Sequence, residues 1–398
     1  MRILICPHQL GMGGSQLHAI EMASAMRHYG YEPMIYSAPG VLTELLRDSG
    51  LEWAEAPGPD VPGLGWSRRL EEIVREHRIG LIHAYEWRPC LQAAFGAGRQ
   101  LPLLMSVMSM DVPRFLPTHV PLVVGTPELH QRMLDQGRRA HLLEPPVDMD
   151  RYRTTDIAAA RARFGIPEGA LVISIVSMLT TALEKLQGVL EAIRVVDRMA
   201  ATRPVRLLIA GDGEGLQAVQ RRAAAVNAHH GWTVVQPVGF QLDASPAYEA
   251  ADIVLGMGSS AIKGLAHAKP LVVHGEAGFW RTLDETTAAG FLHSGWYGRG
   301  GAGIRDLAGA LDPLAESSAR RRQLGAFGRD LVATRYDFDR AAEHLAALYV
   351  DTALGRPPRA AVARSLARSA ATSARYFTSM RFGSVVDREQ WAREGAIA

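Results

Sequence analysis

The chain has 398 residues, of which 47% are hydrophobic and 21% charged, and its net charge is +2. This length exceeds one ordinary hydrophobic core and predicts two domains, and the composition is typical of a soluble globular protein. The sequence contains no run of about 18 apolar residues, so no transmembrane helix is expected. Its only cysteines are Cys6 and Cys90, which excludes a disulfide framework and a cysteine-rich metal site.

The first part of the chain alternates apolar, strand-like runs with helical patterns. Residues Met1–Cys6 enter such a run at once and lack the layout of a signal peptide, so we expect a cytoplasmic enzyme. Strands are predicted at 2–7, 33–37, 80–84, 102–107 and 121–124, and amphipathic helices at about 14–29, 68–78, 88–98 and 127–136.

The second part of the chain follows a proline-rich connector that runs from Glu144–Asp148 through Ile166–Gly169. Its predicted strands lie at 171–177, 205–210, 233–237, 252–256, 270–274 and 290–293. Its predicted helices lie near 184–201, 213–228, 245–250, 259–268, 304–315, 318–334 and 337–353.

Strands that alternate with helices predict parallel sheets with crossover helices. The fold class is therefore α/β, with two doubly wound, Rossmann-like domains whose ligands bind at the carboxyl ends of the strands. We predict an N-terminal domain at 1–150, a C-terminal domain at 151–336, a helix at 337–354 that returns toward the N-terminal domain, and a basic helical tail at 355–398.

The tail holds most of the positive charge. Residues 355–398 contain eight arginines and three acids, so the rest of the chain is slightly negative. On a helix over 359–382, Arg364, Arg368 and Arg375 share one face, and Val362, Leu366, Ala370 and Phe377 lie opposite. Such a helix either lies on an anionic membrane as a peripheral contact or packs on the protein with its arginines in water. We expect no nucleic-acid partner.

A glycine-rich loop, Gly11–Gln16, follows the first predicted strand. Gly13 and Gly14 would let the backbone approach a ligand closely, and Ser15 could cap the helix that follows. The alternative is a plain strand-to-helix turn.

The run from Ala251 to Val273 predicts a strand, a Gly/Ser turn, a helix and another strand. A turn that contains Gly256, Gly258, Ser259 and Ser260 leaves backbone N–H groups suited to a phosphate. Lys185, at an earlier strand-to-helix transition, could place its ammonium on the same phosphate. The alternative for Lys185 is a solvated helix lysine.

Two further strand ends carry polar residues. Gly211 begins a Gly-Asp-Gly turn, for which ordinary turn chemistry is favoured over ligand contact. His83, Tyr85 and Glu86 end a strand of the first domain and form a candidate reaction centre, or else they are capping groups. No set of residues has metal-ligand spacing, including His229–His230, and Asp148–Asp150 is assigned to a connector turn.

Over about residues 1–350 the pattern resembles the retaining glycosyltransferases of the GT-B fold, and is similar to their family 4. The Gly13–Gly14 loop resembles the glycine loop beside the donor phosphates, and Lys185 matches the donor-phosphate lysine. The turn at Gly211 matches another turn of the family, and Gly256–Pro270 aligns without gaps to its donor-binding segment. Where the family pattern has two glutamates, this chain has Leu255 and Lys263.

The resemblance implies an acceptor-side N-terminal domain and a donor C-terminal domain that face a cleft. It implies transfer of a sugar from a nucleotide-diphosphate sugar to a small-molecule or glycan acceptor, with retention and with neither metal nor cofactor. Lys263 would add positive charge at the diphosphate, and His83, Tyr85 or Glu86 would orient the sugar or the acceptor. The aromatic residues Phe279, Trp280, Trp296 and Tyr297 either line an acceptor site or pack a loop.

Two other activities remain open. The replaced glutamates favour a non-catalytic protein that binds a nucleotide sugar or glycan, because fold alone does not fix function. Another reaction of nucleotide sugars, such as epimerisation, would need paired carboxylates, and the sequence offers no convincing pair.

Overall fold

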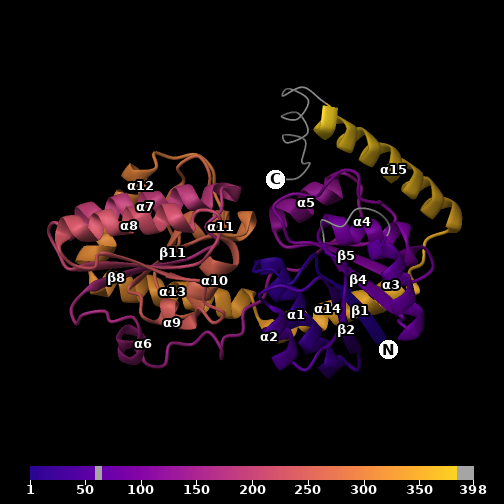
Figure 1. Cartoon of the computed structure of the whole chain (residues 1–398), viewed down its shortest axis with the longest axis horizontal. Coiled ribbons are helices and arrows are strands. Elements are labelled where there is room, and N and C mark those ends of the chain that lie inside the picture. Colours follow the sequence, from indigo (N-terminus) through magenta and orange to yellow (C-terminus); the bar gives the residue numbers. More distant parts are fainter. Residues whose placement is uncertain (59–64, 383–398) are drawn as a thin grey trace. The chain divides into compact units, whose positions relative to one another are not determined.

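The structure is a computed structural model that describes residues 1–58 and 65–382. The chain forms two compact units (Figure 1). Unit 1 contains Met1–Pro145 and the chain from Asp339 onward, and unit 2 is the continuous segment Pro146–Phe338. The chain therefore leaves unit 1 at the paired prolines of the connector and re-enters it at Asp339, at the start of a long helix.

Unit 1 is built on a parallel sheet. In the described part of the chain its strands are β1 (Arg2–Cys6), β2 (Glu32–Ser37), β3 (Glu52–Glu55), β4 (Leu81–Tyr85), β5 (Leu103–Val107), β6 (Leu122–Val124) and β7 (Ala140–Leu142). Their order is β3-β2-β1-β4-β5-β6-β7. The five predicted strands of this region are confirmed, whereas the short edge strands β3 and β7 escaped prediction because each has too few residues for a clear alternation.

Helices cover both faces of this sheet. They are α1 (Gly14–Met26), α2 (Thr43–Asp48), α3 (Gly65–Glu76), α4 (Trp87–Phe95), α5 (Pro127–Asp135), α14 (Phe338–Leu354) and α15 (Arg359–Phe382), with 3-10 turns η1 (Arg27–Tyr29) and η2 (Ala97–Arg99). Apolar side chains of α3, α4 and α5 form one core with alternate strand residues such as Leu4 and Ile82. On the other face, Tyr349 of α14 is buried against His83 of β4.

Unit 2 repeats this architecture with a smaller sheet. Its strands are β8 (Leu171–Val176), β9 (Val205–Ala210), β10 (Val235–Gly239), β11 (Ile253–Gly256), β12 (Leu271–His274) and β13 (Trp280–Thr282), in the order β10-β9-β8-β11-β12-β13. All neighbours are parallel except the edge strand β13, which is antiparallel to β12.

The helices of unit 2 are α6 (Ile157–Arg163), α7 (Lys185–Ala200), α8 (Leu216–His230), α9 (Ser245–Glu249), α10 (Gly258–Ala266), α11 (Ala288–Ser294), α12 (Ile304–Glu316) and α13 (Ser318–Arg335), with the 3-10 turn η3 (Ala182–Glu184). One core packs α7, α8 and α12 on one face of the sheet. A second core packs α10 and α13 on the opposite face. Six of the seven helices predicted for this part of the chain are among them, the seventh (337–353) is α14 of unit 1, and α6 and α11 were not predicted as helices.

The predicted strand at 290–293 is wrong, because these residues lie in helix α11. The carboxylate of Asp284 accepts hydrogen bonds from the backbone N–H groups of Thr286 and Thr287, which builds the turn that starts the helix. Gly295 ends it in the left-handed conformation, with φ of 78°. The apolar pair Phe291–Leu292 gave a strand-like pattern that these two local signals override.

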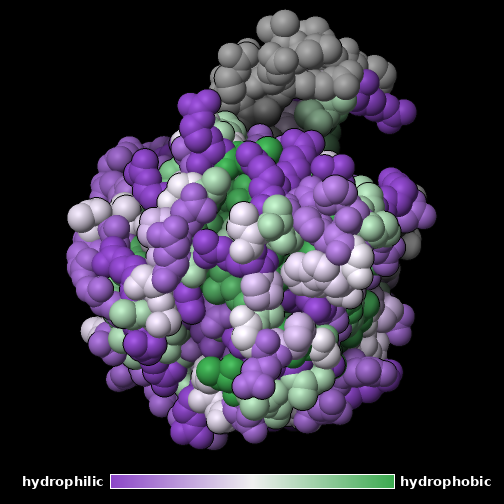
Figure 2. All heavy atoms as spheres, turned by 90° about the vertical axis from the view of Figure 1, so that its left-hand side faces the viewer, coloured by the Kyte–Doolittle hydropathy of each residue, from purple (hydrophilic) through white to green (hydrophobic). Residues whose placement is uncertain are grey.

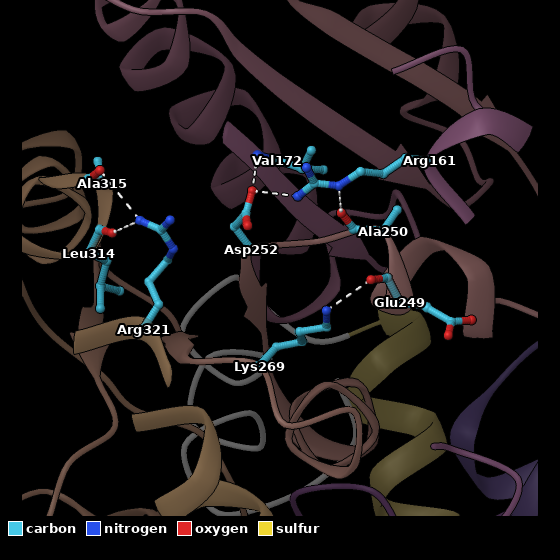
Figure 3. Close-up of polar contacts among 9 residues, drawn as sticks. All are labelled: Arg161, Val172, Glu249, Ala250, Asp252, Lys269, Leu314, Ala315 and Arg321. Atoms are coloured by element: carbon cyan, nitrogen blue, oxygen red, sulfur yellow. Dashed lines mark hydrogen bonds and ion pairs between the residues drawn. The ribbon is translucent and has the colours of Figure 1, made fainter. Parts of the chain in front are cut away.

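Polar contacts hold several segments of unit 2 together (Figure 3). The carboxylate of Asp252 accepts hydrogen bonds from Arg161 of α6 and from the Val172 backbone, both at 2.8 Å. The ammonium of Lys269 donates to the backbone carbonyl of Glu249 at 2.9 Å. Lys269, which lies in the segment that resembles the family's donor site, is therefore engaged within the fold.

The protein surface seen in Figure 2 is mainly hydrophilic, with hydrophobic residues exposed in narrow areas. Among the described residues, no helix is both long and apolar enough to cross a membrane.

Candidate functional site

The strand order of unit 2 brings together the carboxyl ends of β8 and β11, which are followed by the two predicted donor-site segments. β8 and β11 are neighbours, but the chain leaves β8 toward β9 and leaves β11 toward β12, on opposite sides. In doubly wound sheets such a switch point, at the carboxyl ends of the strands, is where ligands bind. Ser260 ties the two segments together, since its hydroxyl donates to the Val176 carbonyl at 2.6 Å.

Lys185 is the first residue of α7, beside this switch point. Leu183 and Glu184 precede it with φ of 55° and 52°, an unusual conformation for two successive non-glycine residues. The carboxylate of Glu184 accepts a hydrogen bond from the Ala277 N–H at 2.9 Å and so fixes this turn. A strained, anchored turn therefore sets the position of Lys185.

The Lys185 side chain is half-buried, and within the described part of the chain it has no hydrogen bond or ion pair. Burial lowers the pKa of its ammonium below the ordinary lysine value. A partly desolvated cation without a partner is unfavourable, and an anionic ligand would relieve this cost. Lys185, Lys263 and Lys269 are the only lysines of the chain, and every other basic side chain apart from histidine is an arginine.

The first turn of α10 forms the other side of this site. Gly258 has φ of 53°, which favours glycine, and its N–H donates to the Trp296 carbonyl at 3.0 Å. The N–H of Gly258 and the hydroxyl of Ser260 are thus already used inside the fold. What the turn offers a ligand is the backbone N–H groups of Ser259 and Ser260 and the Ser259 hydroxyl.

The two positions at which the family has glutamate have clear environments here. Leu255 is buried in the core of unit 2. Lys263 lies on α10 with its Nζ 4.9 Å from the centre of the Tyr152 ring, a cation–π contact. Its ammonium therefore has a partner within unit 2 besides any diphosphate.

Gly211 has a structural reason to be glycine. A Cβ atom there would lie 1.8 Å from the Ser177 carbonyl oxygen, and the Gly211 N–H already donates to the Gly239 carbonyl at 2.8 Å. These contacts support the interpretation of this turn as packing between β8, β9 and β10.

Unit 1 has its own switch point between β1 and β4. The order of its sheet brings the loop after β1, with Gly13 and Gly14, next to the end of β4, where Glu86 lies. Gly13 is extended, and its carbonyl accepts the Leu17 N–H of α1 at 3.1 Å. The backbone N–H groups of the first turn of α1 therefore lie at the carboxyl end of this sheet.

Glu86 is half-buried at this edge, with φ of 63°. Its carboxylate accepts hydrogen bonds from the Met108 N–H at 3.1 Å and the Ser109 hydroxyl at 3.0 Å, and also from the Ser15 hydroxyl. Burial raises its pKa, although these hydrogen bonds oppose the shift. These contacts join three segments. Ser15, predicted as a helix cap, lies inside α1 and donates to Glu86 instead, and the contact of Ser109 was not predicted.

His83 and Tyr85 differ from Glu86 in being inaccessible. The His83 ring is 0% exposed, with its nitrogens bonded to the Tyr349 hydroxyl at 2.8 Å and the Ser106 hydroxyl at 2.7 Å. Burial lowers its pKa to about 3. Tyr85 is 1% exposed and packs on the His83 ring. Neither side chain has a polar atom available to a substrate in this structure.

The aromatic residues of the 279–297 region mainly pack inside unit 2. Trp280 donates to the Glu191 carboxylate at 2.7 Å, and Trp296 donates to the Tyr336 hydroxyl at 2.8 Å. Tyr297 is less buried and is bonded to the Glu276 carboxylate. Among the described residues, no group of three or more His, Cys, Asp or Glu could hold a metal ion.

The architecture with its two switch points defines the class of protein: the chain has the GT-B fold. A glycosyltransferase from Rickettsia africae superimposes with a TM-score of 0.70 at 16% identity, covering 88% of this chain and 98% of that one. Anabaena Alr3699/HepE in complex with UDP-glucose superimposes with a TM-score of 0.68 at 17% identity, covering 88% of this chain and 100% of that one.

Two proteins that are similar in sequence are also named glycosyltransferases. The D-inositol 3-phosphate glycosyltransferase of Stackebrandtia nassauensis is 29% identical over 224 residues, which are 52% of this chain and 47% of that protein. Its counterpart in Geodermatophilus obscurus is 28% identical over 252 residues, which are 58% of this chain and 52% of that protein. The matched segment thus spans about half the length of these curated relatives. No protein-family model matches the chain.

Proposed function

We propose that the chain is a glycosyltransferase that moves a sugar from a nucleotide-diphosphate sugar to a small-molecule or glycan acceptor. The observation that carries this proposal is Lys185, a half-buried ammonium without an ion pair in the described residues, held at the switch point of unit 2 beside the first turn of α10. A diphosphate is the ligand that matches both a cation and backbone N–H donors.

The comparisons support the same donor class. The sequence relatives are named glycosyltransferases, and one structural neighbour was solved in complex with UDP-glucose. Those structural likenesses are below 20% identity, so the choice of nucleobase and sugar in this chain is left to experiment.

In the proposed reaction the bond between the anomeric carbon and the diphosphate oxygen breaks, and negative charge builds on the leaving diphosphate. Lys185 and the N–H groups of Ser259 and Ser260 would stabilise that charge. The leaving oxygen would take the proton of the acceptor hydroxyl as it attacks from the same face, which gives retention and needs no metal. Gly13 and Gly14 would add N–H donors, and Glu86 would orient the sugar or the acceptor through the carboxylate that Ser15 and Ser109 position.

Lys263 has a smaller part in this proposal than its position in the motif suggests. Its ammonium already contacts Tyr152, so it would raise the local positive potential and not bind the diphosphate directly. Lys263→Glu should therefore weaken donor binding less than Lys185→Ala does. Tighter donor binding by Lys263→Glu would show that this lysine has no favourable role at the diphosphate.

A second candidate is a GT-B protein that binds a nucleotide sugar or glycan without transferring it. The observation that favours it is the replacement of both motif glutamates, one of them by the buried Leu255. Slow hydrolysis of the donor without any acceptor separates the two candidates. An active transferase should release the sugar with retained configuration, measured by NMR of the product anomer, and with the same rate in EDTA.

The first experiment is a calorimetric titration of the full chain with UDP, GDP, ADP, CDP and dTDP. We expect one of them to bind, and Lys185→Ala to weaken that binding by about two orders of magnitude, which is the scale of a lost charge-assisted contact. Arg194→Ala, which removes an exposed cation from the same helix, is the matched control and should leave the affinity unchanged.

Failure of every nucleotide to bind to the folded protein would contradict both candidates at the donor site. Equal losses in Lys185→Ala and Arg194→Ala would assign the effect to overall charge and not to this site.

A further inference from the structure

A pocket of about 840 Å³ lies in unit 1, at the edge of the sheet opposite the candidate reaction centre. Its wall includes Leu103, which begins β5, and Pro121, which directly precedes β6, so it lies at the amino ends of two parallel strands. Glu86 and the Gly13–Gly14 loop instead follow the carboxyl ends of their strands. The pocket is therefore separate from the candidate site of unit 1, and none of its described lining residues belongs to unit 2.

Helix α15 forms one side of this pocket because it is attached to unit 1. The Ser369 hydroxyl donates to the Phe115 carbonyl at 2.5 Å, and the Ser365 hydroxyl accepts from the His119 N–H at 3.2 Å. His119 itself lines the pocket, and so does Leu366 of α15, which packs on the core of unit 1. The pocket is thus built from two segments that are far apart in the chain and are joined by these hydrogen bonds.

The charge at the pocket is positive. Its described lining residues include Arg99, Arg356 and Arg359 but no Asp or Glu. Within the described part of the chain, none of these three guanidinium groups has an ion pair or a hydrogen bond. Arg359 is also the first residue of α15, whose first turn contains no acid, so the helix dipole adds to the same potential. Guanidinium groups without partners suit an anion, and their fork of donors matches a phosphate.

The side chain of His119 offers a further polar atom beside the arginines. Its Nδ1 is buried and forms no hydrogen bond among the described residues. Burial lowers the pKa of this histidine, so its ring is neutral near pH 7.5 and can donate through one nitrogen. The ring therefore keeps an unused hydrogen-bonding atom at the pocket.

Much of the remaining wall is apolar. The side chains of Leu101, Val120, Pro357 and Val362 belong to it. A volume of about 840 Å³ is typical of sites for small organic molecules, which range over roughly 300–1,000 Å³. Inorganic phosphate alone would leave most of this space and the apolar wall without contact. The pocket therefore matches a phosphate group that carries an organic body.

We propose that this pocket binds a phosphate monoester of a small organic molecule. The phosphate would lie among Arg99, Arg356 and Arg359, and the organic body would contact Leu101 and Val120. The site is independent of the proposed sugar transfer. Its ligand would join the sheet edge, the end of α14 and the start of α15, so binding should stabilise unit 1. A concave site of this size favours a small molecule over a polyanion, which needs an extended surface.

The test is calorimetric titration of the full chain at pH 7.5 with phenyl phosphate, inorganic phosphate and phenol. Phenyl phosphate combines the charge and the ring, and each of the other two carries one of these features. We expect phenyl phosphate to bind about tenfold more tightly than inorganic phosphate, because the ring is buried against the apolar wall. Phenol should show no measurable binding.

Two double variants with the same change of charge locate the phosphate. Arg356→Gln with Arg359→Gln should weaken phenyl phosphate binding by about tenfold or more, since charge-assisted hydrogen bonds are lost. Arg364→Gln with Arg368→Gln removes two exposed charges of the same helix outside the pocket lining and should bind like the wild type. Lys185→Ala should also keep the full affinity, because Lys185 belongs to the proposed donor site.

Hydrogen exchange gives a second readout of the same site. Phenyl phosphate should slow the amide exchange of residues 98–103, 119–121 and 352–366, which line the pocket or lie among its lining residues. The first turn of α10 should exchange at its original rate. Protection of α10, or loss of binding in Lys185→Ala, would place the phosphate at the donor site and overturn the proposal.

The titrations can also contradict the proposal directly. No saturable binding of phenyl phosphate to the folded protein would exclude this class of ligand. Equal losses in the two double variants would assign the binding to overall charge and not to the pocket. Equal affinities for phenyl phosphate and inorganic phosphate would overturn the role of the apolar wall.

Discussion

At the scale of single residues, Gly211 offers a direct test of whether a motif glycine contacts ligand or serves packing. The atom nearest to an added Cβ would be the Ser177 backbone carbonyl oxygen at 1.8 Å, which cannot move aside as a side chain could. Gly211→Ala should therefore lower the free energy of unfolding by roughly 3 kcal/mol. Urea denaturation measures this change.

The control for Gly211 is Gly290, an exposed residue inside α11 with no atom within 4 Å of an added Cβ. Gly290→Ala should raise the free energy of unfolding by up to about 1 kcal/mol, since alanine favours the helix. If Gly211→Ala instead keeps the stability and weakens nucleotide binding, Gly211 contacts the ligand.

Two buried histidines of unit 1 make its stability depend on pH. Burial lowers the pKa of His83 to about 3 and that of His18 to about 4. The unfolded chain takes up these protons near pH 6.5, whereas the folded chain does not, so stability decreases as the pH falls below about 6.5. His83→Gln keeps polar atoms for Tyr349 and Ser106 and should reduce the loss between pH 7 and pH 5 by about 2 kcal/mol.

Urea unfolding at both pH values tests the histidine prediction. The variant His28→Gln changes an exposed histidine of the same unit and should keep the wild-type dependence on pH. An unchanged slope in His83→Gln would mean that His83 is protonated in the folded protein.

The sequence could indicate the type of residue at each strand end but not its burial. Lys185 and Glu86 were predicted as site residues, and both remain half-buried at switch points. His83 carried the same prediction, yet it lies three residues before Glu86, inside β4, and its ring is covered by α14. The residue that covers it, Tyr349, is distant in the chain, so no local pattern could reveal the contact.

At the scale of secondary-structure elements, the long segments were all predicted, and the elements that were missed or mistaken were all short. Strands such as β1 and β9 are continuous apolar runs, and helices such as α7 and α12 follow a clear hydrophobic period. The elements that were missed or mistaken, among them β3, β7, β13 and α11, have three to seven residues and depend on neighbours or on turn chemistry. Helix α15 was predicted with correct bounds, but Ser365, Ser369 and Tyr376 are its most buried residues, and of the expected apolar residues Leu366 packs on the core whereas Ala370 and Phe377 are exposed.

This packing predicts which side chain attaches α15. Tyr376 is 4% exposed, whereas its neighbour Phe377 is 46% exposed. Tyr376→Ala should destabilise the attachment by about 3 kcal/mol and raise the amide exchange of the last turns of α15 roughly a hundredfold. Phe377→Ala is the matched control and should change this exchange only slightly. Similar effects of the two variants would contradict the burial pattern of the helix.

At the scale of the whole molecule, two doubly wound domains were predictable from the alternation of strands and helices. The sequence led us to expect that the helix at 337–354 returns toward the N-terminal domain, but it did not show which residues the helix contacts there. The packing of α14 on unit 1 depends on pairs such as Tyr349 with His83 and Tyr31. Because these partners are about three hundred residues apart, the sequence could not identify these contacts, which belong to a unit 1 that is discontinuous along the chain while unit 2 is continuous.

This difference predicts how the two units behave when separated. Unit 2, residues 146–338, contains a complete sheet with a core on each face, so it should fold alone. It also contains Lys185 and the first turn of α10, so it should bind the preferred nucleoside diphosphate with an affinity within about tenfold of that of the full chain. The expected difference comes from the N–H donors proposed for unit 1, which the fragment lacks. Circular dichroism and calorimetric titration of the fragment measure both properties.

Residues 1–145 should not fold alone, because without α14 the buried His83 loses its Tyr349 partner and one face of the sheet is left partly uncovered. Adding residues 339–382 as a separate peptide should restore cooperative unfolding. If the 1–145 fragment folds without the peptide, α14 is an accessory helix and not part of the unit 1 core. If the 146–338 fragment folds but binds no nucleotide, the decisive phosphate contacts come from Gly13 and Gly14 and not from Lys185.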